Sequence, residues 1–233
     1  MTPPPHPPLS RVARDAGEGK CSIVVFASGR GSNFAALLTA QQRGGIPVEI
    51  RALLSDKRTA PALLLAENAG IEAITLAPRD YADRAGFDRA IFARAAQFTP
   101  DLIVLAGYMR MIDAQVVAPW IGRMINIHPS LLPKYAGLHT HARALESGDT
   151  VHGASVHFVT AELDGGPVIA QVEMPIERGD TPEALAARLL PLEHRLLVAC
   201  VDLIARGRVV LAGHAVELDG QPLRAPLRPL AAQ

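Results

Sequence analysis

Two separate segments of this chain carry side chains that could stabilise an oxyanion and move a proton. The first, Asn-Ile-His-Pro-Ser-Leu-Leu-Pro (126–133), supplies the amide of Asn126 and the imidazole of His128. The second, Thr-Ala-Glu-Leu-Asp-Gly-Gly-Pro (160–167), supplies the carboxylate of Asp164. An amide can donate to a developing oxyanion, and an imidazole can transfer a proton near neutral pH. Together the three groups suit attack by a nitrogen nucleophile on a carbonyl carbon, without a metal or a covalent nucleophile.

The spacing of Asn126 and His128 predicts that they act from one face of a strand. They are two positions apart in the expected strand 124–128, so both side chains point the same way, about 7 Å apart along it. Pro129 ends this strand, which places His128 at the carboxyl end, where open α/β sheets bind ligands. We expect Asp164 to approach His128 directly or through water, to raise the pKa of the imidazole and to favour the imidazolium. The alternatives are a structural histidine and a turn aspartate.

A glycine-rich turn, Ser-Gly-Arg-Gly-Ser-Asn (28–33), lies between an expected strand and an expected helix. Its glycines let backbone N–H groups approach an anion, and the helix start adds its positive dipole end. The dinucleotide pattern requires a third glycine where Phe34 stands, and Asp56 lies beyond the expected end of the second strand. The Gly-Lys-Ser/Thr of triphosphate loops is absent as well. We therefore expect the phosphate of a sugar monophosphate here, with a ligand-free turn as the alternative.

The elements that position these residues alternate between strand and helix. Short apolar runs that end at glycine or proline predict buried parallel strands, and longer segments stopped by glycine or proline predict helices. The expected strands are 21–27, 48–54, 72–76, 102–106 and 124–128, and the expected helices are 33–42, 59–69, 80–98 and 113–120. This order predicts an α/β fold with a mostly parallel, doubly wound, Rossmann-like sheet.

The pattern changes after about residue 150. Two long strands, 151–160 and 168–175, are joined by a glycine-rich loop and are expected to pair antiparallel. A long amphipathic helix follows over 181–206, with Thr181 as its N-cap. We expect a small hairpin over 208–218 with Asp219-Gly220 as its turn. The second half thus predicts an antiparallel C-terminal extension of the sheet.

Composition limits the partners of the chain. Its 233 residues are 49% apolar, enough for one large α/β domain or two small ones, and its formal net charge is zero. Zero net charge gives no general attraction to nucleic acid or to a membrane surface. We expect a disordered Pro-rich tail over 1–18, a single catalytic domain over 19–220 and a fraying tail over 221–233.

Two further features of the composition bear on the compartment. The N-terminal segment lacks the apolar region of a signal peptide, and no apolar run is long enough to cross a bilayer. The two cysteines, Cys21 and Cys200, match neither a metal spacing nor a disulfide framework. These features favour a reducing, cytoplasmic compartment.

Five histidines lie within thirty residues of one another, and such a cluster raises the alternative of a metal site. They are His128, His139, His141, His152 and His157. However, His139 and His141 are two apart across an expected helix start and do not share a face. No cysteine lies near them, and no His-Glu-x-x-His motif is present. We expect no metal, and we expect His157 to lie on a strand beside the site.

Several of these segments together resemble the phosphoribosylglycinamide formyltransferase family, the folate-dependent enzymes of purine (IMP) biosynthesis. The resemblance covers roughly residues 21–220. The segments that carry it are Ile-Val-Val-Phe-Ala-Ser-Gly-Arg-Gly-Ser-Asn (23–33), Leu-Ala-Gly-Tyr-Met-Arg (105–110), Asn-Ile-His-Pro-Ser-Leu-Leu-Pro-Lys-Tyr-Ala-Gly-Leu-His-Thr-His (126–141) and Gly-Ala-Ser-Val-His-Phe-Val-Thr-Ala-Glu-Leu-Asp-Gly-Gly-Pro-Val-Ile (153–169).

The resemblance implies a reaction and a set of residues. The formyl group of 10-formyltetrahydrofolate would pass to the amino group of glycinamide ribonucleotide, giving formylglycinamide ribonucleotide and tetrahydrofolate. Asn126, His128 and Asp164 would be catalytic, with His128 as the proton donor. The implied ribonucleotide contacts are Gly31, Ser32, Asn33 and Glu193. The implied folate contacts are Arg84, Met109, Arg110, Met111, Ile112, Asn126, Thr160, Ala161, Glu162, Leu163 and Asp164, with Arg84 a partner for the glutamate tail.

Two positions depart from the family pattern. Ala136 stands where the family commonly has proline, which would loosen that loop. Pro191 lies inside an expected helix just before Glu193, which puts in doubt how this turn contacts the ribonucleotide. We expect a monomer or a homodimer acting on small molecules.

Three other functions compete with this one. Methionyl-tRNA formyltransferase usually continues with an Arg-Gly-rich stretch after Leu-Leu-Pro and carries a basic C-terminal domain, neither of which we expect here. Formyltetrahydrofolate deformylase, which hydrolyses the same donor, normally carries an additional N-terminal regulatory domain. A non-catalytic nucleotide-binding protein of this fold would be expected to lose Asn126, His128 or Asp164.

Overall fold

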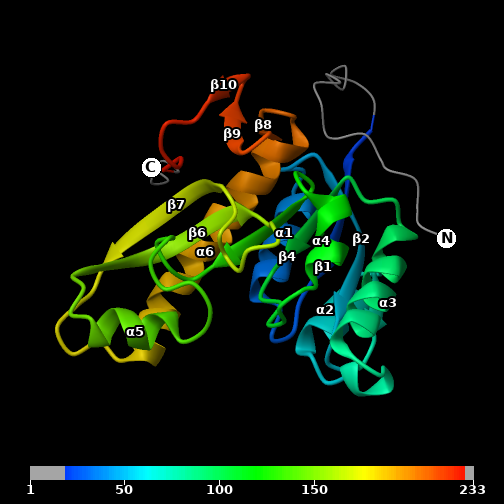
Figure 1. Cartoon of the computed structure of the whole chain (residues 1–233), viewed down its shortest axis with the longest axis horizontal. Helices are drawn as coiled ribbons and strands as arrows, with labels where there is room; N and C mark the ends of the chain where they lie inside the picture. Colours follow the sequence, from blue (N-terminus) through cyan, green and yellow to red (C-terminus); the bar gives the residue numbers. More distant parts are fainter. Residues whose placement is uncertain (1–18, 229–233) are drawn as a thin grey trace.

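The computed structural model describes residues 19–228, and its centre is a seven-stranded sheet (Figure 1). The predicted tail over 1–18 and residues 229–233 lie outside this range. The strand order is β3-β2-β1-β4-β5-β6-β7, parallel from β3 to β5 and antiparallel for β6 and β7. The strands are β1 (Cys21–Phe26), β2 (Val48–Ser55), β3 (Glu72–Thr75), β4 (Leu102–Leu105), β5 (Met124–His128), β6 (Val151–Phe158) and β7 (Val168–Pro175).

Helices cover both faces of this sheet, which confirms the doubly wound prediction. One face packs against α1 (Ser32–Gln42), α2 (Pro61–Asn68) and α6 (Pro182–Ala205), and the other against α3 (Arg84–Ala96) and α4 (Ala114–Val117). The short α5 (Thr140–Glu146) lies against α6. Single 3₁₀ turns are η1 (Pro78–Asp80) and η2 (Ala118–Trp120). No helix within residues 19–228 is long and apolar enough to cross a membrane.

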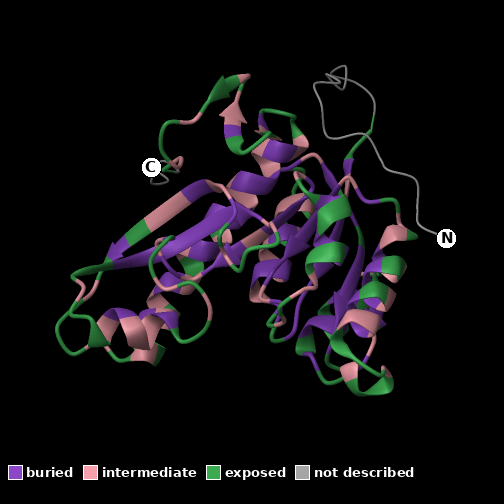
Figure 2. Cartoon of the chain, viewed as in Figure 1, coloured by how far each residue is buried: buried purple, intermediate pink, exposed green. Residues whose placement is uncertain are grey.

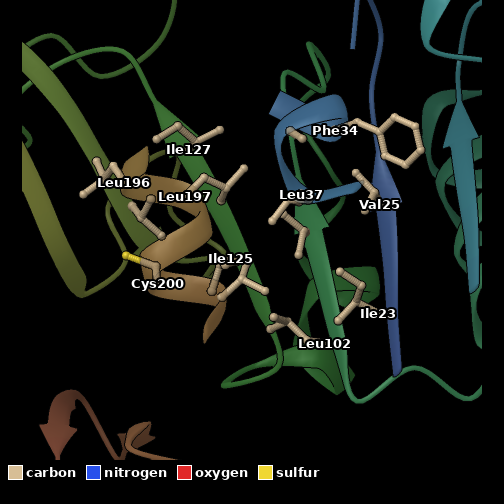
Figure 3. Close-up of a cluster of buried hydrophobic side chains, with 14 of the residues drawn as sticks. Ile23, Val25, Phe34, Leu37, Leu102, Ile125, Ile127, Leu196, Leu197 and Cys200 are labelled. Atoms are coloured by element: carbon tan, nitrogen blue, oxygen red, sulfur yellow. The ribbon is translucent and has the colours of Figure 1, made fainter. Parts of the chain in front are cut away.

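The central strands β1 and β4 are almost entirely apolar, and both of their faces are buried (Figure 2). In β1, Ile23 and Val25 belong to the core under α1 and α6, whereas Val24 and Phe26 belong to the core under α3. Figure 3 shows the first of these cores, in which side chains of α1 and α6 meet those of the strands. The alternation fixes the faces of β5 as well: Ile125 points to this core and Met124 to the opposite one.

The parallel strands bring their carboxyl ends to one edge, and the site is built there. The strand order reverses between β1 and β4, because the chain runs outward from β1 to β3 and returns on the other side of β1. Ligands of open α/β sheets bind at such a switch point. The glycine-rich turn follows β1, the segment Gly107–Asp113 follows β4, and His128 ends β5.

The predicted helices and strands need four corrections. The helix predicted over 80–98 begins only at Arg84, and the one over 113–120 divides into α4 and η2. The strand β2 continues to Ser55, so Asp56 follows it directly instead of lying beyond its end. The terminal hairpin of β8 (Val209–Ala212) and β9 (Ala215–Leu218) turns between them, at 213–214, whereas the predicted turn at 219–220 joins β9 to β10 (Gln221–Pro222).

A further correction concerns the C-terminal segment. The expected fraying is wrong for residues 221–228, because Leu227 donates its N–H to Ile169 and accepts from Gln171 through its carbonyl. These bonds tie the segment to β7. By contrast, Thr181 caps α6 as predicted, accepting from the N–H of Ala184 at 3.2 Å.

Candidate active site

The amide, the imidazole and the carboxylate predicted to react together do meet in the structure. Asn126 and His128 share one face of β5, as their spacing predicts. Asp164 Oδ2 lies 3.5 Å from His128 Nδ1, and Asn126 Nδ2 donates to Asp164 Oδ1 at 3.4 Å. His157, directly opposite Asn126 on β6, places its Nε2 3.2 Å from Asn126 Nδ2 and 3.5 Å from Asp164 Oδ1. Segments far apart in sequence thus form one contiguous polar cluster.

The loop after β6 carries Asp164 back over the end of β5. Asp164 itself adopts a left-handed backbone conformation with φ 49°, which is unusual for a residue with a side chain. A Cβ on Gly166 would collide with the backbone oxygen of Phe158, so the loop can fold back this closely only with glycine there. The N–H of Gly137 donates to Asp164 Oδ2 at 2.9 Å and fixes the carboxylate.

Burial outweighs the predicted effect of Asp164 on the pKa of His128. Burial lowers the pKa of His128 below its ordinary 6.5, although the Tyr135 carbonyl and the charge of Asp164 act to raise it. Its Nε2–H donates to the carbonyl of Tyr135 at 3.0 Å, which leaves Nδ1 facing Asp164. Asp164 thus acts in the expected direction, but the cost of burying the charge is larger, so the imidazolium is not the favoured form in this state.

The carboxylate keeps its charge despite its burial. Burial alone raises the pKa of Asp164, but contact with His157, the N–H of Gly137 and the charge of His128 together hold it below its ordinary 3.8. His157 Nδ1–H donates to the carbonyl of Phe158 at 2.9 Å, which orients the ring with Nε2 toward Asn126 and Asp164. At neutral pH the imidazole of His128 is therefore neutral and the carboxylate of Asp164 beside it is charged.

The loop between β5 and α5 supplies two backbone groups that the sequence did not reveal. Tyr135 presents its carbonyl to His128, and Gly137 presents its N–H to Asp164. The loop is anchored by Ser155, whose Oγ donates to the carbonyl of Ser130 and accepts from the N–H of Leu132. Ser155 lies opposite His128 on β6, and this register is the signal that could have identified it.

The remaining clustered histidines do not form a metal site. His141 Nδ1 and His152 Nε2 are hydrogen-bonded at 3.0 Å, and burial lowers the pKa of both rings, that of His152 to about 4. Within residues 19–228 no group of three or more histidine, cysteine, aspartate or glutamate side chains is arranged to hold a metal ion.

A pocket of about 780 Å³ opens beside the polar cluster and is large enough for a sizeable organic molecule. Four exposed apolar side chains, Met109, Met111, Leu138 and Leu163, surround it. All of the predicted folate residues line it except Arg84, which begins α3. His157 also lines it, as expected from its place on a strand beside the site. Lining residues that the sequence did not indicate are Leu105, Gly107, Tyr108, Val117, Ile127, Pro129, Gly137, Leu138, His139, Thr140, His141 and Val159.

The glycine-rich turn forms the start of α1. Gly31 is the N-cap in a left-handed conformation, with φ 78°, and Ser32 and Asn33 are the first helical residues. Asn33 Nδ2 donates to Glu193 Oε2 at 3.2 Å, so the predicted glutamate does reach the turn despite Pro191 inside α6. Burial raises the pKa of Glu193, while the Asn33 amide acts against this. A buried carboxylate beside a helix start can bind substrate hydroxyl or ammonium groups.

The turn and the pocket are neighbours at the sheet edge. Ser28, the first residue of the turn, donates its N–H to the carbonyl of Gly107 at 3.0 Å, and its Oγ accepts from the N–H of Met109 at 3.0 Å. Ser32 also lines a separate groove of about 720 Å³ between α1 and α6. An anion at the turn and an organic molecule in the pocket would therefore lie close to one another.

Comparisons with known proteins agree with this geometry. Residues 21–201 match the Formyl transferase family. A phosphoribosylglycinamide formyltransferase of Escherichia coli K12 is 45% identical over 202 residues, 87% of this chain and 95% of that protein. The same enzyme of Haemophilus influenzae is 37% identical over 201 residues, 86% and 95% of the two chains. A solved phosphoribosylglycinamide formyltransferase from Coxiella burnetii, in complex with CHES, superposes with a TM-score of 0.84 at 43% identity, covering 88% of this chain and 96% of that one.

Proposed function

Because this chain belongs to the formyl transferase family, we propose that it transfers the formyl group of 10-formyltetrahydrofolate to the amino group of glycinamide ribonucleotide. The products are formylglycinamide ribonucleotide and tetrahydrofolate, and the step belongs to purine biosynthesis. The observation that carries the proposal is the contact of Asn126, His128 and Asp164 beside a pocket, next to a turn suited to phosphate.

The reaction needs one bond made, one broken and one proton moved. The ribonucleotide amine attacks the formyl carbon, and the carbonyl electrons move to its oxygen. The tetrahedral intermediate then expels the folate nitrogen, which takes the proton that the amine gave up. The charge on the oxygen is the feature that a site must stabilise, and the amide of Asn126 is the donor placed to do so.

His128 carries the proton in this proposal. It starts neutral, so it can take the proton of the attacking amine on Nδ1 and return it to the leaving nitrogen. Asp164 remains a carboxylate and stabilises the imidazolium that forms between the two steps. The Tyr135 carbonyl holds the other ring nitrogen and so keeps the ring oriented.

We place the ribonucleotide phosphate on the backbone N–H groups of Gly31, Ser32 and Asn33, at the positive end of α1. Glu193 is positioned by Asn33 to bind the ammonium or the ribose hydroxyls. The pterin end of the donor fits the pocket, whose walls are Met109 to Ile112 and Thr160 to Asp164. Arg84 does not line the pocket, and we assign it to the glutamate tail of the donor, where that tail extends out of the pocket.

We also propose the compartment and the assembly in which the reaction takes place. Cys21 and Cys200 are both buried thiols, which suits a reducing compartment such as the cytoplasm. A monomer or a homodimer remains the expected assembly.

An absorbance assay with and without the ribonucleotide tests the proposal. Tetrahydrofolate should form from 10-formyltetrahydrofolate only when glycinamide ribonucleotide is present. Equal release of folate without the ribonucleotide would instead identify a formyltetrahydrofolate deformylase. No release in either case would identify a non-catalytic member of the family.

A further inference from the structure

The segment Gly107–Asp113 forms one wall of the pocket, although it has no regular secondary structure. It joins β4 to α4, and six of its seven residues line the pocket. Two of them, Met109 and Met111, are 65% and 56% exposed, so apolar packing does little to hold them. Tyr108 and Ile112 pack against the core under α3, and hydrogen bonds from elsewhere position the exposed backbone of this wall.

This wall is anchored at both ends by side chains that accept from its backbone. Ser28 Oγ accepts from the N–H of Met109 near the start of the wall. At its end, Asp88 Oδ2 accepts from the N–H of Asp113 at 2.9 Å. Asp113 then caps α4 by accepting from the N–H of Gln115 at 2.9 Å. The bond to Asp88 therefore fixes the point at which the wall passes into α4.

The burial of the Asp88 carboxylate is energetically unfavourable. It lies on the inner face of α3 with no exposed surface, and its second oxygen, Oδ1, has no hydrogen-bond partner in the described part of the chain. Burial raises the pKa of Asp88, and the N–H of Asp113 and the charges of Arg110 and Arg84 only partly offset this. Burying an incompletely paired carboxylate lowers the stability of the fold. Its presence here indicates a role that an apolar residue could not fill.

Arg110 links this carboxylate to the pocket. It lines the pocket, and its guanidinium lies over the ring of Phe87, 4.9 Å from the centroid, next to Asp88 in sequence. Asp88 thus acts on the wall twice, through the backbone of Asp113 and through the charge of Arg110.

We infer that Asp88 is a positioning residue for the formyl donor, holding the wall Gly107–Asp113 in the place that the pterin end contacts. The inference rests on the proposed function, because it takes the donor to be the occupant of this pocket. It predicts that loss of the Asp88–Asp113 hydrogen bond weakens donor binding and leaves ribonucleotide binding unchanged.

Binding of 10-formyltetrahydrofolate alone, measured by anaerobic calorimetry without ribonucleotide, tests this. Asp88→Ala should raise the donor Kd about tenfold or more, since a hydrogen bond to a charged group is lost. Asp88→Asn, whose amide oxygen can still accept from Asp113, should stay within about threefold of the wild type. The Kd for glycinamide ribonucleotide should not change in either variant. In turnover, the KM for the donor should rise more than kcat falls.

A second pair of variants removes the same bond from its donor side and does not depend on the folding of Asp88→Ala. The φ of Asp113 is −62°, which proline adopts without strain. Asp113→Pro removes both the N–H and the cap of α4, whereas Asp113→Ala removes only the cap. The donor Kd should rise about tenfold in the first variant relative to the second.

The outcomes separate this inference from the function on which it rests. Equal donor Kd values for Asp113→Pro and Asp113→Ala, or for Asp88→Ala and the wild type, would overturn the positioning role. An equal loss of ribonucleotide affinity would show a general structural role instead, and would overturn it as well. A wild-type protein that binds no 10-formyltetrahydrofolate would overturn the proposed function and this inference with it.

Discussion

At the scale of single residues, the site holds its reacting groups in contact before any substrate binds. His128 donates from Nε2 to the Tyr135 carbonyl, and its Nδ1 faces Asp164. Burial keeps the imidazole neutral, while several donors keep the carboxylate ionised. A neutral base beside a charged partner is ready to accept a proton from an attacking amine. The same pair would be a poor proton donor until that proton has been taken up.

Replacing Asp164 by asparagine should therefore slow the chemical step. Asp164→Asn can still accept from Gly137 but no longer stabilises the imidazolium, so we expect kcat to fall about 100-fold or more. Steady-state turnover at neutral pH and calorimetry with the ribonucleotide check this, the latter expected to give an unchanged Kd. Full activity at neutral pH would show that the assigned role is wrong.

Ser32 permits a test of the phosphate site. Ser32→Ala should weaken ribonucleotide binding by roughly 1 kcal/mol, about fivefold in Kd, because one hydrogen bond is lost. Thr39→Ala is a matched control on the same helix, since the Thr39 hydroxyl bonds the carbonyl of Ala35, away from the turn. If both variants bind the ribonucleotide as the wild type does, the phosphate lies elsewhere.

At the scale of the elements, local patterns were sufficient for most of the sheet and for one half of the site. Apolar runs such as Cys21–Phe26 are buried on both faces and are therefore visible in the sequence. The shared face of Asn126 and His128 follows from the two-residue period of a strand, and it is confirmed. The catalytic role of the pair stays a proposal.

Other features depend on contacts that no local pattern carries. Asp164 reaches His128 only because its loop folds back over the end of β5, in a backbone conformation that its own side chain disfavours. The neutral state of His128 results from burial by the completed fold, and Asp88 became visible only through its bond to Asp113. In the C-terminal segment, residues 221–223 bond to β9 and Leu227 pairs with β7 through backbone groups, so its Pro-rich composition was misleading.

The start of α1 offers a prediction at this scale. Gly31 has φ +78°, and a Cβ there would lie 2.7 Å from the Cβ of Ala62 on α2. Gly31→Ala should lower the free energy of unfolding by about 1–3 kcal/mol through backbone strain and crowding. Gly29→Ala is the matched control in the same turn, because a Cβ at Gly29 meets no atom within 4 Å. Urea denaturation of both variants provides the comparison, and equal midpoints would contradict the account of the turn.

At the scale of the whole molecule, one sheet edge collects groups from across the chain. The parallel strands deliver the glycine-rich turn, the pocket wall and His128 to it, and the antiparallel β6 adds His157 and the loop of Asp164. Of the histidines near this edge, His128, His152 and His157 are buried and His141 is half-buried. His128, His141 and His152 all have pKa values below their ordinary 6.5.

This burial makes the stability of the fold depend on pH. The pKa of His152 is about 4 in the folded state and 6.5 ordinarily, so between these values the unfolded chain binds protons that the folded one does not. Stability should hold above pH 6.5 and fall as the pH is lowered toward 4, by up to about 3 kcal/mol for this group. Urea denaturation from pH 7.5 to 4.5 checks the direction, and His152→Gln should flatten the curve. Stability that rises on acidification would contradict the burial of these neutral rings.

The central claim is that His128 and Asp164 act as one unit on a formyl group in transfer. A double-mutant cycle in single-turnover experiments, with both substrates saturating, measures this directly. If the two side chains act together, His128→Ala combined with Asp164→Ala should be about as slow as the slower single variant. Rate losses that instead multiply in the double variant would mean that the two groups act independently, and the proposed mechanism would be wrong.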